Sequence, residues 1–262
     1  MHVEGFDLKQ FQAVLRAYLQ EKPRTGAEIR RKMGEISPGL AQDGIVSSAT
    51  MQLALIQTFP AGTWNFTGPL TYAEAETWLD RSFASPAASL HQLIVRYLAA
   101  FGPASIKDIQ IWSGLTKLQS AVEALRSELM TYRDEQGREL FDLPGAPRPE
   151  AQTPAPVRFL PEFDNLLLAY EDRRRIIADT SRPFVFPGQA MVRATCLVDG
   201  RVQGTWKIER TAARPTLVIE PFESLADQVR QALREEGERL MRWIGDNAEP
   251  FAIQFTAPLV KA

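Results

Sequence analysis

The chain has 262 residues, enough for two or three small domains with hydrophobic cores of their own. Hydrophobic residues make up 45% and charged residues 24% of the sequence, values typical of a globular chain, and the formal net charge is −2. This charge excludes a uniformly basic nucleic-acid binder. A local basic face on an otherwise acidic protein would give the same total.

Residues that build disulfides and zinc sites are scarce. Cys196 has no second cysteine to pair with, and two histidines, His2 and His91, do not make a zinc site of the usual Cys/His type. The first residues lack the pattern of a secretory signal, and no apolar run reaches the ~20 residues of a membrane span. We therefore expect a cytoplasmic protein without a metal, a cofactor or a membrane contact.

Residues 1–85 are predicted to form a winged-helix-like domain. Thr25 and Glu28 form a capping-box pattern at the start of one of its helices, and Ala61-Gly62 is typical of a turn. Apolar spacing predicts three helices and then a hairpin, over residues 7–21, 26–33, 47–58 and 57–66.

Residues 86–145 are predicted to form a second winged-helix domain. An apolar stripe predicts a first helix that ends at Phe101, and Ser105 is expected to cap a second helix over 106–112. Thr116, with Gln119 completing a capping box, is expected to start a longer third helix. A hairpin follows over 131–143, so the order is that of a helix-turn-helix with a wing.

A proline-rich linker over residues 146–156 precedes a β-rich α+β domain over 157–262. Alternating residues predict a strand from Val192, and Asp199-Gly200 is typical of a two-residue hairpin turn. Ser224 is expected to cap one long helix, which leads to a final edge strand over 251–255.

Several polar and basic residues could contact DNA phosphates. They belong to three groups, all with side chains that can bind phosphate. The first group lies on the third helix of the second module, outside its apolar stripe. The second lies on the wing of that module, and the third is a run of three arginines. The residues of the three groups are Lys117, Ser120, Arg133, Arg138, Arg173, Arg174 and Arg175. The alternative is a solvated surface whose arginines pair with Glu171 and Asp172. Asp164 and Asn165 are expected to hydrogen-bond nearby backbone in a turn.

Four blocks of the sequence resemble, in the same order, the winged-helix DNA-binding family related to the AlkZ and YcaQ DNA glycosylases. The blocks are the segments 97–104, 111–115 and 158–177 and the hairpin 197–206. The resemblance implies tandem winged helices, then a barrel-like β domain, and double-stranded DNA as the partner. It also implies a role in the recognition or repair of alkylated DNA.

Glycosylases of that family carry a Gln-apolar-Gln or Gln-apolar-Asp motif in an additional N-terminal module, and we expect this chain to begin after that module. Gln10-Phe11-Gln12 matches the motif, but glutamines two positions apart on a helix point about 200° away from each other. We therefore assign no catalytic residue. An active glycosylase and a transcriptional regulator or protein-contact scaffold remain as alternatives to a DNA-binding protein without catalysis.

Overall fold

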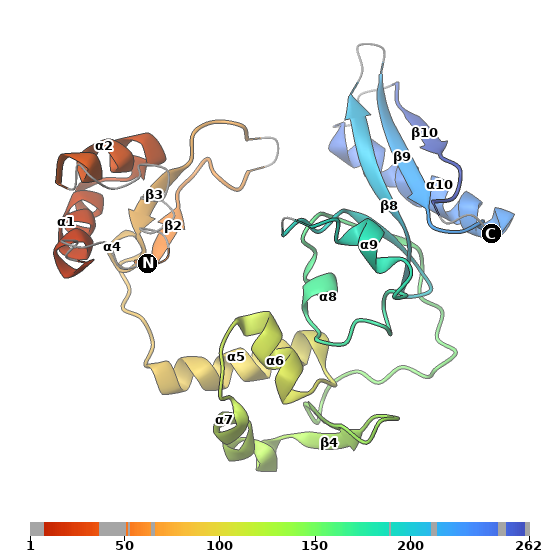
Figure 1. The fold of residues 1–262 in the computed structure, drawn as a ribbon, viewed down its shortest axis with the longest axis horizontal. Helices are drawn as coiled ribbons and strands as arrows, with labels where there is room; N and C mark the ends of the chain where they lie inside the picture. The colour runs from red at the N-terminus through yellow and green to blue at the C-terminus, as the bar shows by residue number, and fades with distance from the viewer. Residues whose placement is uncertain are drawn as a thin grey trace. The chain divides into compact units, whose positions relative to one another are not determined.

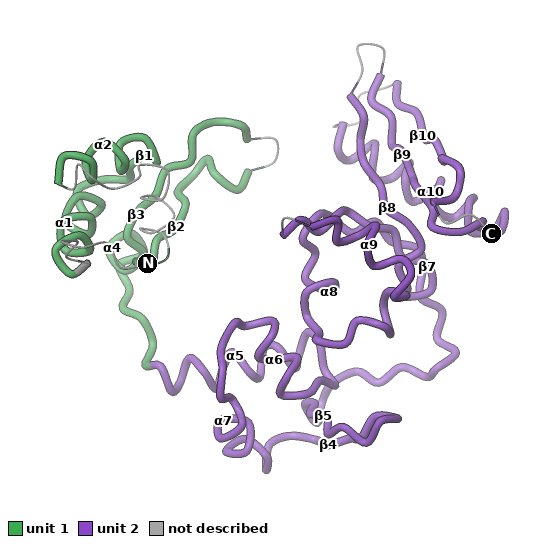
Figure 2. The backbone as a smooth tube through the Cα atoms, viewed as in Figure 1, with its two compact units in different colours: residues 1–85 green, residues 86–262 purple. Residues whose placement is uncertain are grey.

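A computed structural model of the chain describes most of its residues. The described residues are 8–36, 51, 53–63, 66–188, 190–210, 214–245 and 250–259. The chain divides into two compact units, residues 1–85 and 86–262 (Figure 2). Among the described residues, no helix combines the length and the apolar character needed to cross a membrane.

The first unit combines helices with a small antiparallel sheet (Figure 1). Its described elements are α1 (Leu8–Glu21), β1 (Arg24–Thr25), α2 (Gly26–Ile36), β2 (Leu55–Gln57), β3 (Thr71–Glu74) and α4 (Ala75–Leu79). The strand order is β1-β3-β2. The apolar stripes of both long helices meet in a core made of Phe11, Leu15, Leu19, Ile29, Met33 and Leu53.

The first two helices of this unit are confirmed, and so is the capping box that precedes α2. The backbone N–H of Thr25 donates to Oε2 of Glu28 at 2.8 Å, and the N–H of Glu28 donates to Oγ1 of Thr25 at 3.2 Å. These two bonds satisfy backbone donors that the first turn of a helix leaves without a partner.

The expected helix over 47–58 is wrong at its end. Leu55–Gln57 is strand β2, because its backbone pairs with β3 rather than with the preceding helical turn. Residues 47–50 and 52 lie outside the described residues. The hairpin is present but longer than predicted, since its return strand begins at Thr71.

The second unit begins with three helices and a hairpin (Figure 1). The elements are α5 (Pro86–Phe101), α6 (Ile106–Ser113), α7 (Gln119–Ala124), the 3-10 turn η1 (Arg126–Glu128), β4 (Met130–Arg133) and β5 (Glu139–Asp142). The helix end at Phe101, the cap at Ser105 and the hairpin are confirmed. Asp108 completes the capping box with Ser105, an interaction that the sequence prediction did not include.

The expected long helix after Thr116 is wrong. The helix starts at Gln119, its N-cap residue Leu118 contributes no side-chain bond, and α7 has only 6 residues. Lys117 has a φ of 59°, in the left-handed region that a right-handed helix does not tolerate. The expected apolar stripe is buried nonetheless, although the helix is divided into α7 and η1.

In the rest of the second unit, the described residues form a five-stranded sheet and three helices. The strands are β6 (Arg158–Leu160), β7 (Thr195–Val198), β8 (Arg201–Arg210), β9 (Pro215–Pro221) and β10 (Ala252–Phe255), in the order β10-β9-β8-β7-β6. The helices are α8 (Asn165–Leu168), α9 (Arg182–Val185) and α10 (Asp227–Ile244). Positive φ angles at Asp199 and Gly200, 47° and 72°, confirm the predicted hairpin turn, and β10 is the predicted edge strand.

Three expectations for this region need correction. The described strands form an open sheet with two edges, β6 and β10, rather than a closed barrel. The strand expected from Val192 begins at Thr195. The long helix begins at Asp227, not after a Ser224 cap, and its N-cap residue Ala226 makes no side-chain bond. An acidic residue in this first turn, Asp227, interacts favourably with the helix dipole.

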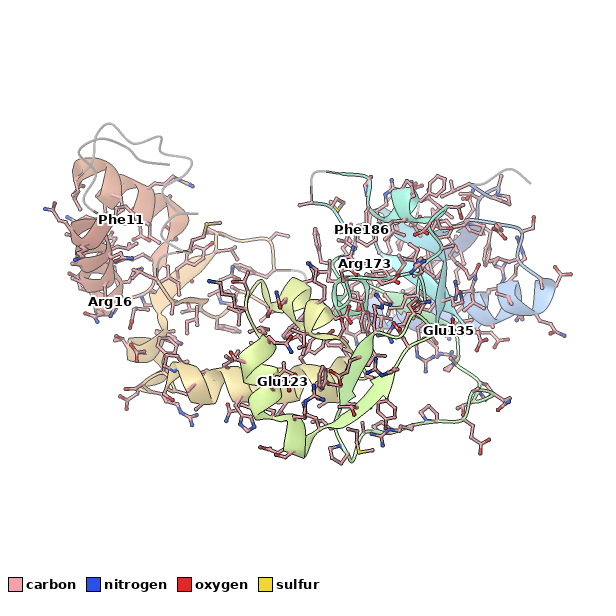
Figure 3. The ribbon with its side chains drawn as sticks, turned by 60° about the horizontal axis from the view of Figure 1, so that its bottom comes forward. Phe11, Arg16, Glu123, Glu135, Arg173 and Phe186 are labelled. Atoms are coloured by element: carbon pink, nitrogen blue, oxygen red, sulfur yellow. The ribbon has the colours of Figure 1, made fainter. Side chains whose placement is uncertain are left out.

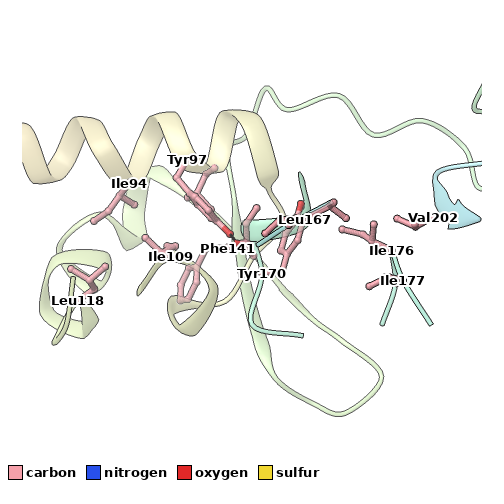
Figure 4. Close-up of a cluster of buried hydrophobic side chains, with 14 of the residues drawn as sticks. Ile94, Tyr97, Ile109, Leu118, Phe141, Leu167, Tyr170, Ile176, Ile177 and Val202 are labelled. Carbon is pink, nitrogen blue, oxygen red and sulfur yellow. Dashed lines mark hydrogen bonds between the residues drawn. The ribbon is translucent and has the colours of Figure 1, made fainter. Parts of the chain in front are cut away.

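A continuous hydrophobic core joins the helices of the second unit to its sheet. It includes side chains of α5, α6 and β5, then of residues 167–177, and finally Val202 and Phe222 (Figure 4). Residues 146–156 contain no helix or strand and are almost entirely exposed. The boundaries predicted around this linker remain a prediction.

Gly204 offers a test of how tightly the sheet is packed. A Cβ atom at this position would lie 2.7 Å from the backbone oxygen of Glu220 and 3.2 Å from Sγ of Cys196. We expect Gly204→Ala to lower the free energy of unfolding by roughly 1–3 kcal/mol, because the backbone of β9 would have to shift. Urea titration followed by circular dichroism measures this change.

The matched control is Gly145→Ala, where the new methyl group would meet no atom within 4 Å. Its effect should stay within roughly 0.5 kcal/mol, as for most exposed substitutions. Equal unfolding midpoints for both variants would contradict the packing described for β8 and β9.

Candidate nucleic-acid interface

The arginine run lies at the end of a segment, residues 158–177, whose fold is set by local caps. Asp164 is the N-cap of α8, and its Oδ1 accepts a hydrogen bond from the backbone N–H of Leu166 at 2.9 Å. This confirms the turn role predicted for Asp164. The expectation for Asn165 is wrong, because its Oδ1 accepts a bond from Nε1 of Trp112 at 3.2 Å, on a different helix.

Besides the bond from Trp112 to Asn165, three further long-range hydrogen bonds attach this segment to α5 and α6. The hydroxyl of Tyr97 donates to the backbone oxygen of Ala169 at 2.6 Å, and that of Tyr170 donates to the oxygen of Phe101 at 2.9 Å. The backbone N–H of Glu171 donates to Oδ1 of Asp108 at 2.8 Å. Burial raises the pKa of both tyrosines, so they remain neutral donors at physiological pH. Figure 4 shows Tyr97 and Tyr170 within the shared core.

The three consecutive arginines have different surroundings. Arg173 stacks over the ring of Phe186 at 4.9 Å, and burial lowers the pKa of its guanidinium (Figure 3). Arg174 forms an ion pair with Asp172, Nη2 to Oδ2, at 2.6 Å. Hydrogen bonds from Arg174 hold the pKa of Asp172 well below its usual value. The guanidinium of Arg175 lies over the ring of Tyr170, 3.7 Å from its centroid.

The tip of the β4–β5 hairpin carries the other two candidate arginines. Nη1 of Arg133 donates to the backbone oxygen of Gly137 at 3.0 Å. Arg138 pairs with Asp134, Nε to Oδ2, at 2.6 Å, and its Nη2 lies 3.5 Å from Oδ2 of Asp172. Asp172 therefore connects the hairpin tip to the arginine run.

A cavity of about 630 Å³ opens between the hairpin tip and the arginine run, and we refer to it as the arginine cavity. Its cationic lining residues are Arg133, Arg138, Arg174, Arg175 and Arg201. Its acidic lining residues are Asp108, Asp134, Glu135 and Asp172. The charged lining residues therefore sum to +1, in a chain whose net charge is −2.

Four of the predicted phosphate-contacting residues thus lie around one cavity, and three do not. Arg173 lines a neighbouring cavity of about 410 Å³ together with Arg182. Lys117 and Ser120 are exposed in the turn before α7 and in its first turn, and they are not among the residues that line the arginine cavity.

Sequence reasoning missed Arg201. The residue follows the Asp199-Gly200 turn, and its Nη1 and Nη2 donate to the backbone oxygens of Arg175 and Arg174 at 3.4 and 3.3 Å. The Asp199-Gly200 turn pattern predicts that a strand begins at Arg201, as β8 does. Nothing in the local pattern indicated that the arginine run would lie against that strand end.

The Gln-apolar-Gln sequence lies in α1 of the first unit, as the periodicity predicted. Phe11 is 2% exposed, in the core of that unit (Figure 3). Gln10 is exposed and Gln12 is partly exposed. On a helix, side chains two positions apart point in directions about 200° from each other. They therefore do not form a converging pair.

Comparison with solved structures identifies the fold of the chain. The mixed α+β fold is similar to that of Streptomyces sahachiroi DNA glycosylase AlkZ, with a TM-score of 0.72 and 21% sequence identity. This similarity covers 94% of the present chain and 68% of the other, and it concerns the fold.

The chain belongs to the AlkZ-like DNA glycosylase family, because the family model "DNA glycosylase AlkZ-like" matches residues 2–243. The family resemblance inferred from the sequence is thereby confirmed. A curated relative, the interstrand DNA cross-link repair glycosylase of Streptomyces sahachiroi, is 29% identical over 170 residues. That match covers 62% of the present chain, which spans only 44% of the length of the relative.

Tyr97→Phe tests the attachment of the arginine run. The substitution keeps the ring and removes only the donor to the oxygen of Ala169, so we expect the free energy of unfolding to fall by roughly 1–3 kcal/mol. Tyr132→Phe is the control, because Tyr132 is a partly exposed residue of strand β4 whose hydroxyl makes no such bond within the described part of the chain. Chemical denaturation of both variants gives the comparison. An unchanged midpoint for Tyr97→Phe would show that this bond does not contribute.

Proposed function

We propose that the chain binds duplex DNA through the arginine cavity and acts in the recognition or repair of alkylated or cross-linked DNA. The observation that carries the proposal is the gathering of five arginines from three segments around one cavity. Phosphate groups bind to clustered arginines largely independently of base sequence. We therefore expect modest affinity and weak sequence preference. Family membership and the printed name of the curated relative support repair as the setting.

We further propose that residues 1–85 and 86–145 are two winged-helix domains, joined through the linker 146–156 to the α+β domain 157–262. The helix order and the hairpins support this division. In a winged helix the residues at the start of the helix after the tight turn enter or border a DNA groove. Lys117 and Ser120 occupy that position, and we assign them secondary phosphate contacts. We place the protein in the cytoplasm.

Binding of a phosphate in the arginine cavity must compete with carboxylates that are already there. Asp172 accepts bonds from Arg174 and approaches Arg138, so it occupies cationic groups that would otherwise face DNA. Removing its charge should leave these arginines free to meet phosphate.

Asp172→Asn should therefore tighten duplex binding several-fold, whereas Arg174→Ala should weaken it. The Arg174→Ala variant should also reduce the slope of log affinity against log salt, because it leaves the carboxylate of Asp172 without its cation beside the DNA backbone. Fluorescence anisotropy with a labelled duplex at several KCl concentrations measures both quantities.

Arg239→Ala is the control, because Arg239 lies on α10, is exposed and pairs with Glu236. Its affinity and salt slope should match those of the unmodified chain. If Asp172→Asn and Arg174→Ala behave like this control, the arginine cavity is not the DNA-binding site.

Base excision is the second candidate function, and the name of the curated relative favours it. Excision requires a nucleotide flipped into a pocket and polar groups that stabilise the developing charge. The glutamines of α1 diverge, and for this reason we expect that the chain alone does not release alkylated purines.

Release of N7-methylguanine from a methylated duplex tests this expectation, with the native chain compared to Gln10→Ala combined with Gln12→Ala. With either protein, N7-methylguanine should be released only at the rate measured in buffer without protein. Release by the native chain that the double substitution abolishes would show that the two glutamines act together despite their positions on α1. Release that survives the substitution would direct attention to Asp164.

A further inference from the structure

Three of the five arginines around the arginine cavity make no ion pair with a carboxylate in the described part of the chain. Arg138 and Arg174 are neutralised by Asp134 and Asp172. By contrast, Arg133 and Arg201 donate to backbone oxygens, and Arg175 stacks on an aromatic ring. Their positive charges are held in place but are not cancelled.

Arg175 and Arg201 are fixed relative to each other by the backbone. The two terminal nitrogens of Arg201 donate to the carbonyl oxygens of Arg174 and Arg175. Arg175 rests on the ring of Tyr170, which is itself held by the oxygen of Phe101. A guanidinium carries five N–H donors, so each arginine keeps donors for an anion. An oriented and uncompensated pair of this kind loses little side-chain entropy when it binds a ligand.

We propose that Arg175 and Arg201, with Arg133 from the hairpin, bind a single phosphate group in the arginine cavity; we call these three residues the phosphate seat. The inference rests on the proposed function, since in that setting the phosphate belongs to a DNA strand. The same chemistry would accept free inorganic phosphate. Planar guanidinium groups match the oxygen pairs of a phosphate in a way that a lysine ammonium cannot.

The acidic groups of the cavity leave room for this anion. Both oxygens of Asp108 are engaged, Oδ1 by the N–H of Glu171 and Oδ2 by the N–H and hydroxyl of Ser105. Asp134 and Asp172 are paired with Arg138 and Arg174. Glu135 is exposed on the hairpin tip (Figure 3). An incoming phosphate thus meets three guanidinium groups that are not ion-paired with a described carboxylate, in a lining whose charges sum to +1.

The test compares the native chain with a double variant, Arg175→Lys with Arg201→Lys, which keeps both charges and removes both guanidinium groups. Duplex affinity is measured by anisotropy at constant ionic strength, with chloride replaced stepwise by inorganic phosphate. Phosphate should compete with DNA for the native chain, and this competition should disappear in the double variant. The double variant should also bind DNA about tenfold more weakly in chloride, although its charge is unchanged.

A second readout does not require DNA. Phosphate should raise the melting temperature of the native chain more than that of the double variant, because binding to the folded state stabilises it. The general stabilisation that phosphate gives to any protein cancels in this comparison. Arg239→Lys, a conversion outside the cavity, should behave as the native chain. If the double variant melts early in chloride, Arg133→Lys, an exposed position, replaces it in both assays.

The outcomes separate the two proposals. In one outcome the native chain binds no duplex, but phosphate raises its melting temperature and does not raise that of the double variant. This outcome would refute DNA binding and support the phosphate seat. Duplex binding with equal phosphate competition and equal melting shifts in the native and variant chains would refute the phosphate seat and leave DNA binding in place.

Discussion

The buried hydroxyl of Tyr97, a residue of α5, donates to the backbone oxygen of Ala169, and the candidate interface depends on this attachment. Together with the bonds from Tyr170 and to Asp108, it joins the first helices of the second unit to residues that follow them by more than 60 positions. Polar groups buried this deeply are costly unless they are paired, so these bonds favour one arrangement of the segment over others. The arginine run is thereby held opposite the hairpin tip.

The charge arrangement around this attachment explains how a chain of net charge −2 can present a cationic site. Carboxylates and arginines line the cavity together, and Asp172 links the hairpin to the arginine run. Such pairs near the surface add little stability. Here these ion pairs determine which guanidinium groups are bound to carboxylates and which remain available to an anion.

The sequence predicted most elements whose signals are local. The capping box at Thr25, the Ser105 cap and the Asp199-Gly200 turn follow from short-range geometry and were found in place. Two failures have identifiable physical causes. Strand β2 lies where the sequence predicts a helix, because a short apolar run fits both structures until its pairing partner is known. The start of α7 was misplaced because a left-handed residue, Lys117, has no signature in the side-chain pattern.

The candidate interface was predictable in part for the same reason. Arginines on the hairpin and in the run could be identified as cationic, and the pairing of Arg174 with Asp172 is an alternative that the local sequence already offers. The approach of Asp172 to Arg138, 34 positions away, depends on the tertiary fold. Arg201 belongs to the site only because strand β8 starts beside the arginine run. There the backbone N–H of Val202 donates to the oxygen of Ile176 at 2.8 Å, and the side chain of Arg201 donates to the oxygens of Arg174 and Arg175. Periodicity alone does not contain this information.

The edge strand β10 has a consequence for solubility. It runs parallel to β9 and covers the side of that strand, whose Leu217, Val218 and Ile219 are buried. Without those four residues of β10, the backbone of a seven-residue apolar strand would be open to pairing with another molecule, a common route to aggregation. Because β10 lies beyond residue 243, where the family match ends, shortening the chain to the matched region would expose that strand.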